Sequence, residues 1–492
     1  MKSFGSPGNQ RINFAVSKAQ ETETFSLRFP SMFLLFIVFF SALTSTSFAF
    51  PNEELRQLWD ISTKEVKTET IKSYRRGNIK VEEVYYLSRS YKRQPVRIFG
   101  YYCYPVNHAG KLPAILLSHG GGGCASLARA DAWARRGYAV LAIDLPGKGE
   151  KRACSRSTGP DMDVVNLVKT EPDPSYNYLV HAVAAARNGI TFLTQRKEVD
   201  ADRIGMIGLS WGGVLTILTN GQDTRLRAAV NVFGAGYIPE GCTWEKWFKA
   251  MPAADKEIWD KYIDPKNFLA SQHAPILFIT GTNDHCYYLP TFQKSYEQVT
   301  APKNYYLIAN CRHRFLSEAA DPALAWLDKK LKNGGSFPAV GLIGPFQTNE
   351  KKVIISARIR SDNPVASVRL YYTFGGPQQW TEKQWYEVMP FKENGTYYFG
   401  IPTKRLTPEI LYYVSAKDSR GGASSSLIRS LFAVKFKDAN TFATSGPITK
   451  IYQHAAPYTF LNGLVSSTIR FIQLETGRGY QAYDVDSAPP TP

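Results

Sequence analysis

The pattern of hydrophobic and polar positions changes several times along the chain, and its first clear form lies between Lys80 and Pro105. The segments KVEEVYYLSR and VRIFGYYCYP each alternate with a period of two, and the polar stretch SYKRQP joins them. Such alternation is typical of half-buried strands, because successive side chains of a strand point to opposite faces. We therefore predict an antiparallel hairpin here.

Past the hairpin, short apolar runs alternate with segments in which apolar residues repeat at helical spacing. The runs that predict buried strands are residues 113–121, 138–147, 203–210, 227–236, 275–284 and 304–310. The longest helical segment is 176–196. Strands separated by helices imply a mostly parallel sheet with helices on both faces. The predicted fold class of residues 50–334 is therefore α/β.

One segment inside this domain, residues 240–269, is rich in aromatic residues and has no strand character. Two interpretations are open. The segment forms a small cap over the C-terminal edge of the sheet and lines a substrate cleft, or it is an insertion that packs its tryptophans inward. We expect the cap.

The pattern of hydrophobic and polar positions changes again after residues 335–343. This stretch is rich in Gly and Pro, and we interpret it as a linker. Residues 344–437 contain short alternating strands at regular spacing with turn residues between them. This pattern predicts an all-β sandwich of immunoglobulin or fibronectin type. Residues 438–492 show no clear period, and we expect a flexible tail.

The N-terminal 49 residues contain the apolar run MFLLFIVFF, from Met32 to Phe40, followed by small residues before Phe50. Nine residues are too few for a membrane span, which needs about 18 or more, but they fit the apolar core of a signal peptide. We expect export with cleavage near Ala49, a secreted or periplasmic product, and no stable membrane insertion afterwards.

Composition and charge limit the kinds of molecule that the protein is expected to bind. The chain is 44% hydrophobic and 13% aromatic, which suits a globular protein of two or more domains. Its formal net charge is +17, yet the basic residues are spread along the chain with no run of five or more, so we predict no nucleic-acid site. The six cysteines form no CxxC motif or Cys/His cluster, so no metal site is predicted.

The candidate chemistry lies where a strand pattern changes into a helix pattern. Gly208, Leu209, Ser210, Trp211 and Gly212 match G-x-S-x-G, in which the serine occupies a tight, strained turn above a sheet. Five residues are a weak signal alone, but their place between a strand and a helix is the expected context. We predict that Ser210 is a nucleophile.

A serine hydroxyl needs a base to remove its proton and an acid to orient that base. In enzymes with this turn the chain order is Ser, acid, His, so the base comes after Ser210. His313 follows the last predicted strand, and we expect it to be the base; His285 also follows a strand. Asp284 ends the preceding strand and is the expected acid, while Asp144 ends a strand on the wrong side of Ser210 in chain order.

The negative charge that develops on an attacked carbonyl needs backbone donors. One predicted donor is the amide of Trp211, at the start of a helix whose positive dipole end adds to the field. The other is expected from SHGGGG, in which four glycines after a strand let N–H groups approach a substrate closely. We choose Gly121 for this second oxyanion-hole donor.

The predicted triad also suggests a disulfide. Cys286 lies two residues after Asp284, and Cys311 lies two residues before His313. If the acid and the base meet, their loops come within a disulfide's reach, about 4.4 to 6.8 Å between Cα atoms. We therefore predict a Cys286–Cys311 bridge.

Taken together, the run DADRIGMIGLSWGGVLT, the HGGGG loop, GTND, NCRH and the β-rich C-terminal module resemble the acetyl xylan esterase and dienelactone hydrolase-like branch of the α/β-hydrolases. The resemblance covers roughly residues 54–434. It implies Ser210, Asp284 and His313 as the triad, with neither a metal nor an organic cofactor. The flanking Arg312 and Arg314 depart from the small or Gly-rich residues that follow the histidine in many relatives.

The resemblance implies an exported serine carboxylesterase that deacetylates carbohydrate, with a small-molecule or polysaccharide ester as substrate and the sandwich placing it on the polymer. Two alternatives remain open. One is a prolyl-oligopeptidase-like peptidase, which uses the same triad order but would need groups that bind a peptide amine. The other is an inactive hydrolase domain in a carbohydrate-binding protein, against which a complete triad argues.

Overall fold

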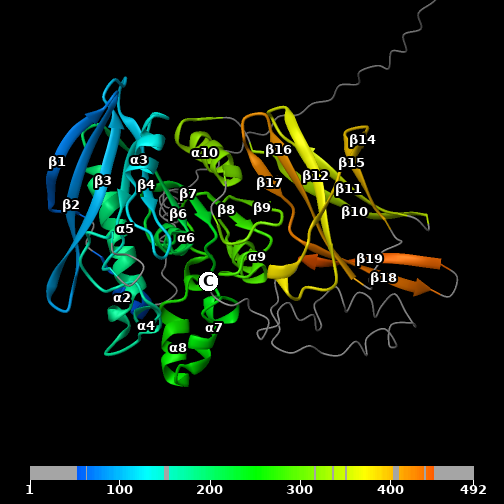
Figure 1. Ribbon diagram of the computed structural model, residues 1–492, viewed down its shortest axis with the longest axis horizontal. Helices are drawn as coiled ribbons and strands as arrows, with labels where there is room; N and C mark the ends of the chain where they lie inside the picture. The colour runs from blue at the N-terminus through cyan, green and yellow to red at the C-terminus, as the bar shows by residue number, and fades with distance from the viewer. Residues whose placement is uncertain are drawn as a thin grey trace, which may run out of the picture. The chain divides into compact units, whose positions relative to one another are not determined.

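A nine-stranded sheet with the order β1-β2-β3-β5-β4-β6-β7-β8-β9 organises the first part of this computed structural model (Figure 1). The structure describes residues 53–61, 64–148, 154–314, 317–334, 337–349, 352–402, 409–436 and 439–447. The predicted export signal lies outside these residues, as does the predicted tail beyond Pro447. No helix in the described ranges is long and apolar enough to cross a membrane.

The sheet begins antiparallel and becomes parallel. Its strands are β1 (Thr68–Arg76), β2 (Ile79–Tyr91), β3 (Gln94–Pro105), β4 (Leu112–Ser118), β5 (Ala139–Ile143), β6 (Val199–Leu209), β7 (Leu226–Val232), β8 (Ile276–Gly281) and β9 (Lys303–Ile308). β2 and β3 form the predicted hairpin, and all pairs from β5 through β9 are parallel. The sequence did not predict β1, because its side chains are almost all exposed and show no apolar face.

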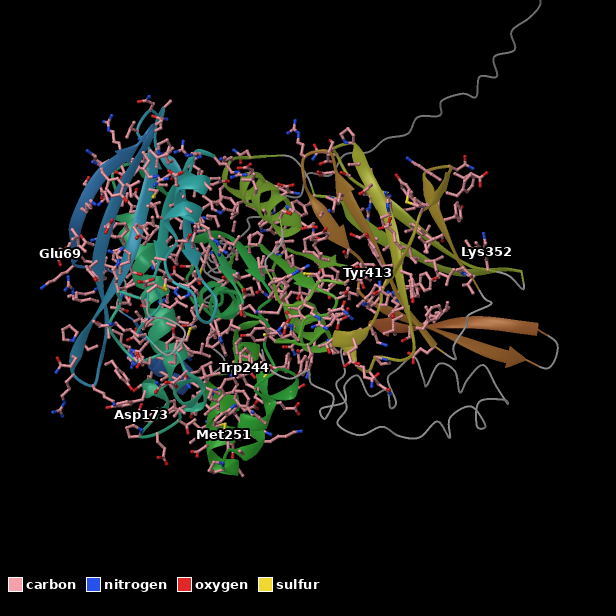
Figure 2. All side chains as sticks on the ribbon, viewed as in Figure 1. Glu69, Asp173, Trp244, Met251, Lys352 and Tyr413 are labelled. Carbon is pink, nitrogen blue, oxygen red and sulfur yellow. A yellow bond between two sulfur atoms is a disulfide. The ribbon has the colours of Figure 1, made fainter. Side chains whose placement is uncertain are left out.

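Helices cover both faces of the sheet. They are α2 (Glu53–Leu58), α3 (Leu127–Ala134), α4 (Val164–Val168), α5 (Tyr178–Thr194), α6 (Trp211–Asn220), α7 (Glu245–Ala250), α8 (Ala253–Tyr262), α9 (Leu289–Gln298) and α10 (Ser317–Leu331), with short 3-10 turns η1 (Pro174–Tyr176), η2 (Ile238–Glu240) and η3 (Pro265–Phe268). Side chains of α5, α6 and α9 share one hydrophobic core, and those of α3 and α10 share a second. Figure 2 shows side chains filling the space between these layers.

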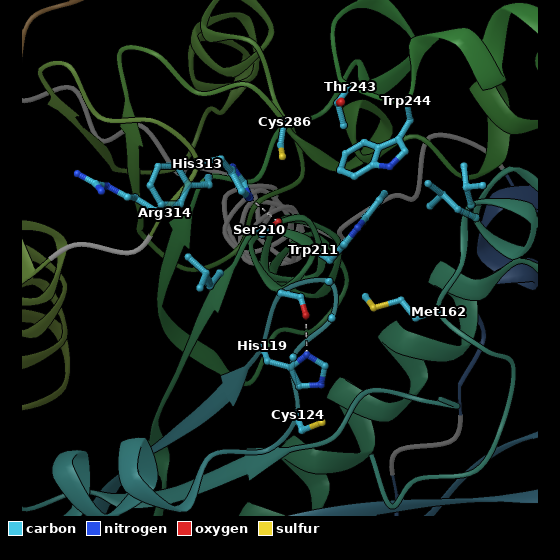
Figure 3. A pocket seen from close by; sticks show the side chains of 18 of the residues that line it. His119, Cys124, Met162, Ser210, Trp211, Thr243, Trp244, Cys286, His313 and Arg314 are labelled. Atoms are coloured by element: carbon cyan, nitrogen blue, oxygen red, sulfur yellow. Dashed lines mark hydrogen bonds between the residues drawn. The ribbon is translucent and has the colours of Figure 1, made fainter. Parts of the chain in front are cut away.

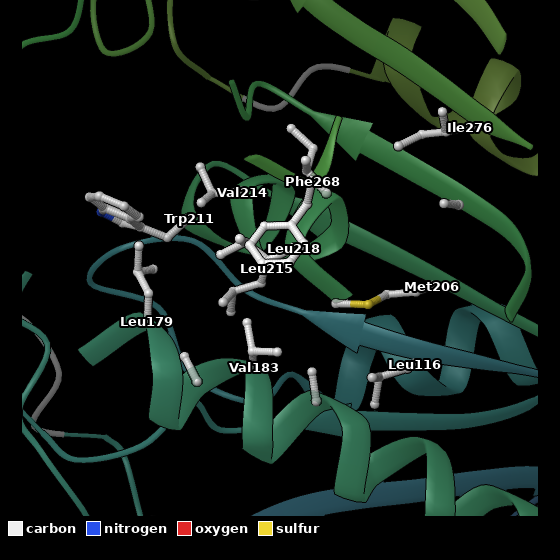
Figure 4. Packing of buried hydrophobic residues seen from close by; sticks show 14 of the residues in the cluster. Leu116, Leu179, Val183, Met206, Trp211, Val214, Leu215, Leu218, Phe268 and Ile276 are labelled. Atoms are coloured by element: carbon white, nitrogen blue, oxygen red, sulfur yellow. The ribbon is translucent and has the colours of Figure 1, made fainter. Parts of the chain in front are cut away.

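The parallel strands divide their side chains between the two cores. In β8, Ile276 and Phe278 belong to the core beneath α5 and α6, whereas Leu277 and Ile279 belong to the opposite one. This is the period of two expected for a strand buried on both faces. Figure 4 shows α5 and α6 meeting over the sheet, with Leu179, Val183, Val214 and Leu215 between them.

Two antiparallel sheets form the C-terminal β-sandwich. One has the order β10-β11-β15-β14, and the other has β13-β12-β16-β18-β19 with β17 paired to β16. The strands are β10 (Ala339–Asn349), β11 (Lys352–Arg360), β12 (Val365–Phe374), β13 (Tyr386–Val388), β14 (Phe391–Glu393), β15 (Thr396–Pro402), β16 (Glu409–Asp418), β17 (Ala423–Ser425), β18 (Arg429–Phe436) and β19 (Ala439–Pro447); η4 (Trp380–Glu382) precedes β13. Apolar residues from both sheets share one core.

The sandwich starts earlier and ends later than the sequence predicted. β10 begins at Ala339, inside the predicted linker, and its pairing with β11 contains two register shifts, one between Leu342 and Gly344 and one between Gln347 and Asn349. β19 lies beyond residue 437 and pairs with β18. Gly341 and Gly344 of β10 indicate turns in the sequence, but in the structure they pair with Arg358 and Ser356 of β11.

The sandwich is joined to the α/β part by more than a linker. The described residues of both parts belong to one compact unit. Trp380, Trp385 and Tyr413 of the sandwich belong to the same hydrophobic core as α5 and α6. β17 also lies against β9, the last strand of the large sheet, where the Ser425 hydroxyl accepts a 3.0 Å hydrogen bond from the N–H of Leu307.

The predicted disulfide between Cys286 and Cys311 is wrong, because both residues are free thiols. Cys286 packs beside the core under α6, whereas Cys311 belongs to the core on the opposite face of the sheet. The two loops meet as expected, but these side chains point to different faces. Instead, Cys124 and Cys154 are bonded, with their Cα atoms 6.2 Å apart.

The disulfide that does form should contribute measurably to stability. Cys124 and Cys154 are 30 residues apart, and closing a loop of this length in the unfolded chain corresponds to about 3 to 4 kcal/mol. We expect the Cys124→Ser, Cys154→Ser double variant to lose that much free energy of unfolding in urea. Wild type unfolded in the presence of dithiothreitol should have the same free energy of unfolding as the variant. If dithiothreitol has no effect, and if both Cys124 and Cys154 can be alkylated without reductant, the bridge is contradicted.

Candidate active site

Ser210 lies at the corner where β6 ends and α6 begins. Its backbone has φ 59° and ψ −118°, a region that residues with a side chain rarely adopt and that costs roughly 1 to 3 kcal/mol. The N–H of Ser210 donates to Val232 O at 2.8 Å, which ties the corner to β7. A side chain at Gly208 would collide with the backbone of Gly212, so the strand and the helix approach this closely only because glycine is present.

Three of the predicted residues come together above this corner (Figure 3 shows Ser210 and His313). His313 Nε2 lies 2.8 Å from Ser210 Oγ, and His313 Nδ1 lies 2.9 Å from Asp284 Oδ1. In the arrangement that this geometry favours, the serine hydroxyl donates to Nε2 and the Nδ1–H donates to the carboxylate. Ser210 follows β6, Asp284 follows β8 and His313 follows β9, so all three come from the carboxyl edge of the parallel sheet.

The carboxylate of Asp284 is fully buried and has several donors around it. Its Oδ1 also accepts from the N–H groups of Cys286 at 2.8 Å and Tyr287 at 3.2 Å. Its Oδ2 accepts from the Thr280 hydroxyl at 3.2 Å. Such donors stabilise a negative charge away from water, and they orient the carboxylate toward the imidazole.

Two opposing effects set the protonation of His313. Burial lowers the pKa of the imidazole, but the charge and hydrogen bond of Asp284 outweigh burial, and Cys286 adds to them. The pKa of His313 is therefore raised above its ordinary value. The ring of His285 lies 5.9 Å from that of His313, and burial lowers the pKa of His285. His313, and not His285, makes the hydrogen bonds to both Ser210 and Asp284.

The glycine-rich loop after β4 closes over the serine. A Cβ on Gly120 would lie 3.0 Å from Ser210 Cβ, and one on Gly121 would lie 2.8 Å from the Trp211 ring. Gly123 N–H is used within the loop, donating to Gly120 O at 3.1 Å. Among the hydrogen bonds of the described residues, none uses the N–H of Gly121 or of Trp211. These two amides are thus placed near Ser210 and are available to a ligand.

This loop is held by a histidine, His119, that the sequence did not predict. His119 Nε2 accepts the N–H of Leu145 at 3.0 Å, and its Nδ1 lies 2.7 Å from Gly120 O. These two contacts fit the tautomer that carries its proton on Nδ1. His119 precedes Ser210 and so falls outside the Ser, acid, His order, although the glycines beside it are a signal for a functional role.

Asp144 has a supporting position and does not contact His313 in any hydrogen bond of the described chain. Its carboxylate accepts the N–H of Ala125 at 2.5 Å and the N–H of Arg156 at 2.8 Å. The Cys124–Cys154 disulfide links the same two segments. Asp144 and the disulfide together fix the continuation of the glycine loop.

A cavity of about 860 Å³ opens in front of Ser210 and His313. The glycine loop and His119 line one side of it, and Trp211, Trp244 and Met162 line another (Figure 3). Trp244 precedes α7, so the segment predicted as a cap does contribute to the cavity wall. The same segment packs Trp259 inward, fully buried, so each of the two interpretations describes part of it.

A metal site is not favoured at this position. Ligand atoms of Asp284, Cys286 and His313 lie within 4.8 Å of one another. However, the carboxylate and both ring nitrogens already take part in the hydrogen bonds described above. The donor set therefore fits a proton-transfer chain better than the coordination of a cation.

The sheet order and the strained serine corner define an α/β-hydrolase fold, followed by a β-sandwich. Within this class, residues 47–238 match the family model described as acetyl xylan esterase, and residues 182–333 match that of the prolyl oligopeptidase family. The chain therefore resembles acetyl xylan esterases over residues that include Ser210, and prolyl oligopeptidases over residues that include Ser210, Asp284 and His313.

Several known proteins are similar to parts of this chain. The acetyl esterase Axe7A of Xylanibacter ruminicola is 26% identical over 249 residues, which are 48% of this chain and 56% of that protein. The chain spans about half the length of the curated relatives it matches. Acetyl xylan esterase 1 from a Thermoanaerobacterium species is 19% identical, with a TM-score of 0.48 over 56% of this chain and 93% of that one. The acetyl xylan esterase from Paenibacillus sp. R4 is 21% identical, with a TM-score of 0.46 over 56% and 92%.

Replacing Asp284 should change the titration of His313. In Asp284→Asn the main cause that raises the pKa of His313 is gone, while burial still lowers it, so the pKa should fall. Because only the neutral imidazole accepts the Ser210 proton, any residual reaction of Ser210 with a fluorophosphonate should persist to lower pH than in wild type. The rate itself should drop by on the order of 10³ to 10⁴, because the wrong tautomer is favoured.

The matched control is Asp202→Asn, an exposed aspartate on β6, which should leave the pH profile of labelling unchanged. If the labelling rate falls at the same acidic pH in wild type and in Asp284→Asn, Asp284 does not set the pKa of His313.

Proposed function

We propose that this protein is a serine carboxylesterase that removes acetyl groups from carbohydrate. The observation that carries the proposal is the hydrogen-bonded chain from Ser210 through His313 to the buried Asp284. The match of residues 47–238 to the acetyl xylan esterase family supports the acyl group and the substrate class. A cavity with aromatic and polar walls supports an ester carried on a sugar, since aromatic faces and hydrogen-bonding groups are both present.

In this mechanism Ser210 Oγ attacks the ester carbonyl carbon while His313 Nε2 takes the hydroxyl proton. The charge that forms on the carbonyl oxygen is stabilised by the N–H groups of Gly121 and Trp211, and the dipole of α6 adds to the field. Asp284 stabilises the imidazolium. The C–O bond to the alcohol then breaks, and His313 gives its proton to the departing oxygen, leaving the acyl group on Ser210.

Water completes the cycle. His313 Nε2 takes a proton from a water molecule as the water oxygen attacks the acyl carbon. The bond to Ser210 Oγ breaks, the serine oxygen recovers a proton from His313, and acetic acid is released. No step needs a metal or an organic cofactor.

Export is part of the proposal. It rests on the apolar run from Met32 to Phe40 and the small residues before Phe50. A secreted or periplasmic enzyme would meet acetylated polysaccharide outside the cell, and an oxidising compartment would allow the Cys124–Cys154 disulfide to form. We also propose that the sandwich contacts the polymer.

The second candidate is a serine peptidase, favoured by the match of residues 182–333 to the prolyl oligopeptidase family. The same triad would serve both reactions, so a substrate screen separates them. The purified protein should hydrolyse aryl acetate and release acetate from acetylated xylan faster than it cleaves longer acyl esters or an aminoacyl-proline amide. Cleavage of the amide alone would favour the peptidase.

Ser210→Ala should lower turnover of aryl acetate by at least about 10³-fold and leave the fold intact, because the oxyanion donors alone give only part of the acceleration. Steady-state kinetics and circular dichroism would measure the two quantities. The matched control is Ser317→Ala, an exposed serine at the start of α10 that contacts Glu318. An alanine variant at position 210 with wild-type turnover would contradict the serine mechanism.

A further inference from the structure

The two loops that carry Asp284 and His313 are both bound by one segment of the sandwich. Asn283 directly precedes Asp284, and Asn310 lies three residues before His313. Both asparagine side chains make hydrogen bonds to the backbone of residues 381–385, which contain the end of η4 and the approach to β13. This segment is about a hundred residues from Asn283 and about 75 from Asn310 along the chain.

Asn283 uses its amide group to hold the acid loop. Its Nδ2 donates to Lys383 O at 2.6 Å and to Thr381 O at 3.2 Å, and its side chain is buried. Two carbonyls of the sandwich segment are thereby satisfied at once. Loss of the amide would leave the buried carbonyl of Thr381 and the partly buried carbonyl of Lys383 without this donor, which weakens the contact between the acid loop and the sandwich.

Asn310 makes a two-way contact that holds the base loop. Its Nδ2 donates to Trp385 O at 2.9 Å, and its Oδ1 accepts the N–H of Trp385 at 2.8 Å. Its backbone has φ 55°, in the left-handed region that asparagine tolerates better than most residues. Asparagine therefore meets two requirements here, the turn that leads to His313 and the contact with Trp385.

The two loops are also bonded to each other beneath these contacts. The Thr282 hydroxyl donates to Asn283 Oδ1 at 2.7 Å and accepts the N–H of Asn310 at 2.8 Å. The N–H of Asn283 donates to Cys311 O at 3.0 Å. A shift of the sandwich segment would therefore move both loops.

The sandwich segment is itself firmly held. Trp380 and Trp385 are 1% and 2% exposed and belong to the hydrophobic core of the α/β part. The Trp385 ring meets that of Tyr413 on β16 edge-on, with centroids 5.3 Å apart. Two buried indoles fix the backbone to which Asn283 and Asn310 bind, so the anchor does not depend on the asparagines alone.

We propose that Asn283 and Asn310 are positioning residues through which the β-sandwich sets the distance between Asp284 and His313. The sandwich is then part of the catalytic machinery, in addition to any contact it makes with a polymer. This inference rests on the proposed function of the triad. Its physical basis is that a misplacement of about 1 Å in a reacting group can cost on the order of 10²-fold in rate.

The test uses the full chain with Asn283→Ala and Asn310→Gly, the latter because glycine keeps the positive φ without strain. The matched control is Asn304→Ala. Asn304 Nδ2 also bonds the sandwich, donating to Ser424 Oγ at 2.7 Å, but it lies at the opposite end of β9 from His313. The measurements are kcat and KM for aryl acetate, the rate of fluorophosphonate labelling of Ser210, and the downfield proton resonance of the His313–Asp284 hydrogen bond.

We expect each of the two clamp variants, Asn283→Ala and Asn310→Gly, to lose about 10- to 100-fold in kcat and in labelling rate with little change in KM. The downfield resonance should shift or disappear in both. Asn304→Ala should keep all of these values at a comparable change in melting temperature. If the clamp variants match Asn304→Ala in kcat, labelling and resonance, the positioning role is overturned. Should Asn283→Ala fail to fold, Asn310→Gly decides.

Failure of the proposed function would look different. Wild type would then neither hydrolyse the ester nor label at Ser210, whereas failure of the positioning role leaves wild type fully active and the clamp variants with it.

Discussion

A carboxylate with no exposed surface is the constraint on which the site depends. Asp284 is fully buried, and a buried charge is tolerated only where donors surround it. The loop after β8 meets this requirement with the N–H groups of Cys286 and Tyr287, and the loop after β9 meets it with the imidazole of His313. The hydrogen bond from His313 Nδ1 to Asp284 also fixes the orientation of the imidazole, and this orientation places Nε2 beside Ser210 Oγ.

The sequence predicted most of the α/β part and the three residues of the hydrogen-bonded chain. Ser210 was found because its flanking glycines coincide with a change from strand to helix pattern, and Asp284 and His313 because parallel strands end at one edge. Both observations predict the path of the backbone, and the structure has the backbone path that they predict. They say nothing of side-chain direction, which is why the pairing of Cys286 with Cys311 was wrong.

Other features were beyond sequence reasoning because distant packing determines them. Asn283 and Asn310 resemble ordinary loop residues in the sequence, and their partners, Lys383 and Trp385, lie 100 and 75 residues further along the chain. β1 lacks an apolar face and is held by its pairing with β2, and the glycines of β10 indicate turns in the sequence but are held in a strand by pairing with β11. In each case the missing information is a tertiary contact.

The position of β17 over β9 has a consequence for how this architecture can vary. The last strand of an open sheet offers unpaired N–H and C=O groups that recruit other chains, and natural proteins cover or interrupt such edges. Here Ser425 takes the N–H of Leu307, so the β-sandwich serves as the edge cover of the hydrolase sheet. In this chain, separation of the two domains would uncover β9, so the α/β part on its own would carry an exposed strand edge able to pair with another chain.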